Sequence, residues 1–72
     1  MFFSNSNDHS SQNDTMLNIE VLNQGSFWVQ VASAYPNETR ISDRLAVALR
    51  NNPNASRARA VGNITGRIYD IT

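Results

Sequence analysis

The side chains that most often carry catalysis are scarce in this sequence. It contains no cysteine, no lysine and a single histidine, His9. His9 lies in a run of polar residues, where no neighbouring element is expected to orient it as a general base. The six carboxylates are scattered, and neither Asp43 nor Asp70 has an evident partner. We therefore expect no catalytic residue and a protein that is not an enzyme.

Metal-binding and phosphate-binding motifs are also missing from the sequence. His9, together with Asp8 and Asp14, matches none of the ligand spacings of zinc or calcium loops. Gly62 and Gly66 flank a turn, but the Lys-Ser/Thr pair and the helix of a phosphate-binding loop do not follow. The sequence predicts no metal site and no cofactor.

Length and charge narrow the class of protein further. The 72 residues can form one small domain, and the formal net charge of zero argues against binding to nucleic acid or membrane by bulk electrostatics. No apolar run approaches the ~20 residues of a membrane span, and Met1-Phe2-Phe3 is shorter than the core of a signal peptide. We expect a cytoplasmic protein without membrane contact. Because a domain of this size buries a smaller share of its surface than a large domain does, we also expect self-association.

The clearest secondary-structure signal is a helix over about residues 38–51. Its apolar stripe, with a 3.6-residue period, consists of Ile41, Leu45, Ala48 and Leu49. Asn37 or Thr39 would cap the start of the helix, and Glu38 would lie in the first turn, where the helix dipole favours a carboxylate. The run Asn51-Asn52-Pro53 would end it, since proline disfavours the helical conformation of the residue before it.

Four segments of alternating polarity flank this helix. They predict strands over about residues 16–22, 26–34, 57–61 and 66–71. Asn23-Gln24-Gly25 would form the first turn, with Gly25 free to take a positive φ. In the second strand, the alternation places Val31 on the apolar face and Ala32 on the opposite one. The last strand has a mixed pattern, which indicates an edge strand or a bulge.

The element order β-β-α-β-β predicts an α+β fold. We expect a two-layer sandwich in which one helix packs on one face of a mainly antiparallel four-stranded sheet. Residues 1–15 contain mostly polar side chains and are expected to form a disordered arm, which leaves residues 16–72 as a single domain. A single helix can cover only one face of such a sheet, so the other face is expected to be open.

The alternation assigns residues to the two faces of the predicted sheet. Beneath the helix we expect Leu17, Ile19, Phe27, Val29, Ala58 and Ala60. The opposite face would then carry the candidate binding residues Trp28, Gln30, Arg57, Arg59, Arg67 and Tyr69. Tryptophan, tyrosine and arginine are the residues that most often anchor protein interfaces. Ion pairs across the strands between these arginines and Glu20 are a structural alternative for part of the pattern.

Two functions are compatible with this face. The first is a protein-interaction or assembly module that binds another protein or, most simply, forms a homodimer. The second is a single-stranded nucleic-acid-binding protein in which Trp28 and Tyr69 stack on bases and Arg57, Arg59 and Arg67 contact phosphates. The zero net charge favours the first, because non-specific nucleic-acid binding draws most of its strength from released counterions.

Overall fold

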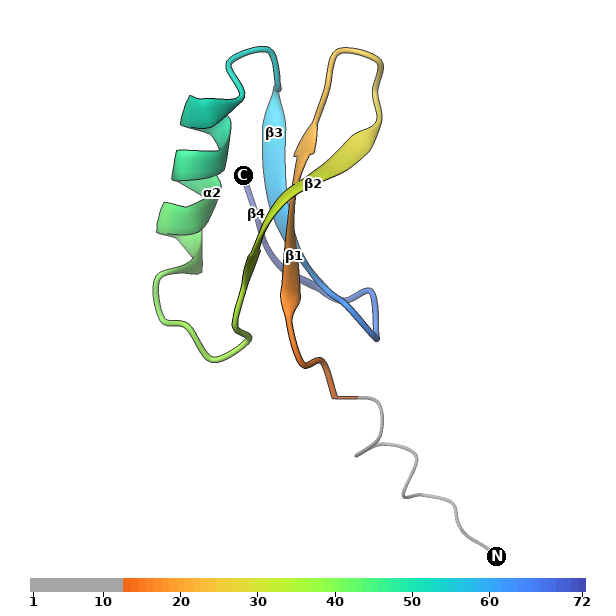
Figure 1. Ribbon diagram of the computed structural model, residues 1–72, viewed down its shortest axis with the longest axis vertical. Coiled ribbons are helices and arrows are strands. Elements are labelled where there is room, and N and C mark those ends of the chain that lie inside the picture. The colour runs from red at the N-terminus through yellow and green to blue at the C-terminus, as the bar shows by residue number, and fades with distance from the viewer. Residues whose placement is uncertain (1–12) are drawn as a thin grey trace, which may run out of the picture.

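The computed structural model describes residues 13–72, which form one sheet and one helix (Figure 1). In chain order the elements are β1 (Leu17–Leu22), β2 (Trp28–Ala34), α2 (Ile41–Asn51), β3 (Arg57–Gly62) and β4 (Ile68–Ile71). The sheet has four strands in the order β2-β1-β3-β4, and all neighbouring strands are antiparallel. The predicted α+β fold with the order β-β-α-β-β is confirmed. Within the described residues, no helix is long and apolar enough to cross a membrane.

Figure 1 shows α2 as one layer beside the sheet, with no described element on the opposite side of the sheet. The predicted arm, residues 1–15, falls outside the described residues except for residues 13–15. These last three residues precede β1, and Asp14 and Thr15 are hydrogen-bonded to the turn between β3 and β4. The contacts of the described fold therefore begin before residue 16.

A small core rich in alanine lies between α2 and the sheet. Its buried members are Leu17, Ile19, Val21, Ala34, Leu45, Ala48, Ala58 and Ala60. Leu45 is fully buried, and Ile41 and Leu49 pack against the cluster, so the predicted apolar stripe of the helix is confirmed. Ala58 and Ala60, on the strand beneath the helix, have small side chains that let α2 come close to the sheet.

The helix starts later than its sequence pattern suggested. Its first residue is Ile41, and neither Asn37 nor Thr39 caps it. Glu38 instead precedes the helix and accepts hydrogen bonds from the Tyr35 N–H at 2.8 Å and from Arg44 Nε at 3.0 Å. These two donors hold the pKa of Glu38 below its usual value. Glu38 thus stabilises the loop that leads into α2.

The helix ends within the predicted run Asn51-Asn52-Pro53, and the side chain of Asn52 caps it. Asn52 Nδ2 donates a hydrogen bond to the Ala48 carbonyl at 2.8 Å, and the Asn52 backbone N–H donates to Leu49 O at 3.1 Å. Two of the carbonyls that a helix leaves without partners are satisfied in this way. Asn52 has φ −132°, so the cap does not use the left-handed conformation.

Asn23 builds the turn between β1 and β2. Its side-chain oxygen accepts hydrogen bonds from the backbone N–H of Gly25 at 2.9 Å and of Phe27 at 3.0 Å. The positive φ of this turn, 65°, belongs to Ser26, so the prediction that Gly25 supplies it is wrong. The hydrogen bonds to Asn23 hold Gly25 and Phe27, the two neighbours of Ser26, so the positive φ falls on Ser26 between them.

A β-bulge in β2 changes which of its residues face the helix. Val29 pairs with Val21 of β1, but the register then shifts, and Ala32 pairs with the buried Ile19. Val31 is the extra residue, so the prediction that Ala32 lies on the face opposite the helix is wrong. The register also brings Ala34, rather than a larger side chain, into the core.

The predicted core positions at the start of β2 are largely uncovered. Phe27 precedes the strand and is 68% exposed, and Val29 is 42% exposed. Figure 1 shows the physical reason: the first half of β2 runs away from α2, which packs mainly against β1 and β3. The prediction that Phe27 belongs to the core is therefore wrong.

We predict that Leu45→Ala lowers the free energy of unfolding by ~2–5 kcal/mol, because it leaves a cavity under the helix. Urea denaturation followed by circular dichroism measures the change. Val47→Ala is a suitable control on the same helix, because Val47 is 39% exposed and its truncation should cost much less. Equal losses for the two variants would contradict the packing described for α2.

Candidate functional site

The sheet face opposite α2 is not covered by any described element. Strand pairing places the following side chains on this open face: Asn18, Glu20, Leu22, Trp28, Gln30, Ser33, Arg57, Arg59, Val61, Ile68 and Ile71. Four of the six candidate binding residues, Trp28, Gln30, Arg57 and Arg59, are therefore neighbours on one surface. Five apolar side chains of the open face surround its charged centre, and Ile68 and Ile71 are the most exposed of them.

Arg59 occupies the centre of the open face and contacts two partners. Its Nε donates to Glu20 Oε1 at 2.8 Å, across the pairing of β1 with β3. Its guanidinium carbon also lies 4.0 Å from the centroid of the Trp28 ring, which is a cation–π contact. The side chains of Arg59 and Glu20 are only 26% and 18% exposed. Arg59 is thus neutralised by Glu20 and covers one side of the tryptophan ring.

The other two polar candidates on this face also have partners within the chain. Arg57 Nε donates to the backbone oxygen of Thr72 at 3.0 Å, beyond the end of β4. Gln30 Nε2 donates to Ser33 Oγ at 3.2 Å, along its own strand. Both side chains are therefore hydrogen-bonded within the chain.

Tyr69 does not lie on the open face, and its predicted placement there is wrong. A bulge in β4 makes Tyr69 the extra residue between Ile68 and Asp70. Its ring packs against the core cluster on the helix side, and the guanidinium carbon of Arg67 lies 5.0 Å from the centroid of that ring. Arg67 and Tyr69 therefore contact each other rather than the Trp28–Arg59 centre.

The Tyr69 hydroxyl belongs to a hydrogen-bond network around Asp14. One carboxylate oxygen of Asp14 accepts the backbone N–H groups of Ile64 and Thr65, both at 2.8 Å. The other accepts the hydroxyls of Thr65 and Tyr69, also at 2.8 Å. The Asp14 carboxylate occupies the space that a Cβ at Gly62 would fill, so this position requires glycine.

This network lowers the pKa of Asp14 to about 2, chiefly through the Thr65 N–H, with the Thr65 hydroxyl, the Ile64 N–H and the Tyr69 hydroxyl adding to the effect. The hydrogen bond between the Tyr69 hydroxyl and Asp14 also raises the pKa of Tyr69. Through these four hydrogen bonds, Asp14 joins the segment before β1 to the β3–β4 turn and to Tyr69 of β4. The partners of Asp14 lie 50 or more residues away in sequence, and no local pattern indicates them.

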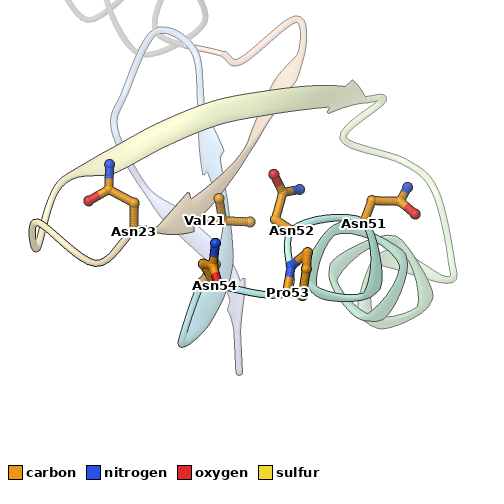
Figure 2. Close-up of a pocket in the computed structure, with 7 residues that line it drawn as sticks. Val21, Asn23, Asn51, Asn52, Pro53 and Asn54 are labelled. Atoms are coloured by element: carbon orange, nitrogen blue, oxygen red, sulfur yellow. The ribbon is translucent and has the colours of Figure 1, made fainter.

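A pocket of about 210 Å³ at the end of α2 is an alternative candidate site. It is lined by Val21, Asn23, Asn51, Asn52, Pro53, Asn54 and Ala55. Figure 2 shows Val21 at its centre, between Asn23 from the β1–β2 turn and Asn51 and Asn52 from the end of the helix. No lining residue is titratable, and the amides of Asn23 and Asn52 are already bonded to the backbone. Such a pocket has no group that could perform acid–base or nucleophilic chemistry.

No group of three or more His, Cys, Asp or Glu side chains within residues 13–72 could hold a metal ion. Comparison of the chain with protein-family models, with curated proteins and with solved structures finds no match. Among the described surfaces, the open face offers the richest set of interacting side chains.

We predict that Asp14→Asn destabilises the fold at neutral pH and that its effect fades in acid. A carboxyl with a depressed pKa in the folded state stabilises the protein above its unfolded pKa, near ~3.9. This stabilisation is lost as the pH falls through the folded value of about 2. Urea denaturation at several pH values should show the difference between wild type and variant shrinking between about pH 4 and pH 2.

Asp43→Asn is the control for this experiment, because the ion pair of Asp43 with Arg40 is exposed and should contribute little. A difference between wild type and Asp14→Asn that stays constant across this pH range would contradict the network around Asp14.

Proposed function

We propose that this protein is a non-enzymatic interaction module that self-associates through its open face. One observation carries the proposal: the fold leaves this face uncovered although it displays Arg59 among five apolar side chains, one of which is Trp28. Interface cores are typically apolar and aromatic, are enriched in arginine and contain few unpaired charges. The open face has this composition.

The pairing within the open face lowers the cost of covering it. Arg59 already contacts Glu20, and most of both side chains is shielded from water in the single chain. Burial of a lone charge in an interface is strongly unfavourable, whereas a pair that is already formed and largely desolvated has less hydration to lose. A partner surface can therefore pack on the centre of this face without supplying a counter-charge for Arg59.

A second copy of the chain is the partner that the size of the protein favours. A domain of 72 residues without cysteine buries a modest share of its surface alone, and association extends its core. Contact across a twofold axis uses the same patch on both copies. Trp28 and the exposed isoleucines of β4 would then be buried together.

Single-stranded nucleic acid is supported less well as a partner. Arg59 and Arg57 both donate to acceptors within the chain, and Arg59 covers one side of the Trp28 ring. Tyr69, which would be the second stacking platform, packs on the helix side. The neutral net charge also leaves little electrostatic attraction for a phosphate backbone.

We predict that Trp28→Ala raises the dissociation constant of self-association by about thirtyfold or more, because truncation of an aromatic interface anchor costs ~2 kcal/mol or more. Sedimentation velocity over a range of protein concentrations measures it. Trp28 is the one tryptophan of the chain, so its emission in the wild type should also shift as the concentration rises.

Tyr35→Ala is the matched control, since Tyr35 is an aromatic residue 62% exposed and outside the open face. It should leave the dissociation constant unchanged. Circular dichroism and urea denaturation establish that both variants remain folded. Unchanged association of a folded Trp28→Ala variant would refute the proposed interface, and saturable quenching of Trp28 by short single-stranded DNA would support the nucleic-acid function instead.

A further inference from the structure

The two edges of the sheet differ in length and in charge. β2 forms one edge with seven residues, and none of them is charged. β4 forms the other edge with four residues, which include Asp70, and Arg67 directly precedes it. Edge strands present unpaired N–H and C=O groups and are usually protected from pairing by charges, by proline or by short length. β4 has such protection, whereas β2 has only its bulge.

The surroundings of the β2 edge are also uncharged. Glu20 and Glu38 bracket residues 21–37, which contain no charged side chain. Two copies of β2 placed side by side would therefore bring no like charges opposite each other, whichever register they adopted.

Exposed apolar side chains lie beside the same edge. A groove of about 200 Å³ separates β2 from α2. Its lining residues are Ile19, Val31, Ala32, Arg44, Val47, Ala48, Asn51 and Asn52. Val31 and Val47 are each 39% exposed, and Val29, nearer the start of β2, is 42% exposed. A strand added to this edge would cover part of this valine surface while its backbone paired with β2.

We propose that β2 pairs with β2 of a second copy in antiparallel orientation, which joins the two sheets into one. The contact is self-complementary, because each strand offers the other an uncharged backbone edge flanked by valines. A twofold contact of this kind closes on itself, whereas pairing of β2 with β4 would propagate head to tail. This surface is distinct from the open face and goes beyond the function proposed above.

The absence of cysteine from the chain makes a direct test available. Single cysteines are introduced in turn by Val29→Cys, Gln30→Cys, Val31→Cys, Ala32→Cys and Ser33→Cys, and each variant is oxidised with copper phenanthroline at several protein concentrations. Residues that face each other near the twofold axis of an antiparallel pair have Cα atoms about 4.5–5.5 Å apart, within the range of a disulfide. At least one variant should therefore form a covalent dimer rapidly.

Ile64→Cys is the matched control, because Ile64 is 48% exposed and lies in the turn between β3 and β4, away from the β2 edge. It should cross-link only at the slow rate of random collisions. If all five β2 variants are as slow as this control, the edge contact is overturned.

A second set of variants separates this contact from the open face. The cysteine variant that cross-links fastest should still cross-link rapidly when it is combined with Trp28→Ala, because edge pairing does not require the tryptophan ring. Val31→Lys, without an introduced cysteine, should reduce edge pairing, since lysine on an edge strand opposes it. A dimer that persists in solution while no β2 variant cross-links would refute the edge contact and leave the proposed function standing. Rapid cross-linking of a β2 variant, together with an unchanged dissociation constant in Trp28→Ala, would support the edge contact and refute association through the open face.

Discussion

The close packing of α2 on one face of the sheet is the constraint on which the rest of the structure depends. The strand beneath the helix presents Ala58 and Ala60, which allow a short distance between the two layers, and Leu45 fills the space between them. One helix covers only one face of the sheet, and it has too little width to cover all four strands of that face. The open face and the first half of β2 are therefore left exposed. Both surfaces proposed for association result from this exposure.

Polar contacts complete what this small core does not secure. Asp14 joins the segment before β1 to the β3–β4 turn. Glu38 stabilises the loop that precedes α2, and Asn52 caps the end of that helix. Each of these groups satisfies backbone N–H or C=O groups that would otherwise lack partners within the chain. Arg59 differs from them, because it pairs with the Glu20 side chain on the open face rather than with a backbone group.

The helix and the strand order along the chain could be predicted because their signals are local. The stripe that contains Leu45 and the alternation through Leu17 and Ile19 need only neighbouring residues to be recognised. Errors arose where a bulge inserts one residue, because side-chain direction then reverses. This happened in β2, where Ala32 turned toward Ile19, and in β4, where Tyr69 turned toward the helix side.

The candidate site was predicted in part for the same reason. Trp28 and Arg59 share a face because they precede or lie outside the bulges, but their contact with each other depends on the register of three strands. The role of Asp14 could not be predicted, because its partners are distant in sequence and its own neighbours are polar and irregular. Long-range hydrogen bonds of this kind leave no periodic signal.

We propose that the chain associates with itself through the surfaces that its single helix leaves uncovered. The most direct test is the solution mass of the full chain, measured by light scattering behind a sizing column at low and at high salt. We expect a mass above that of a single 8.0 kDa chain which rises with concentration and resists salt, because the buried surfaces are largely apolar. A monomer at every concentration and at both salt concentrations would contradict the account.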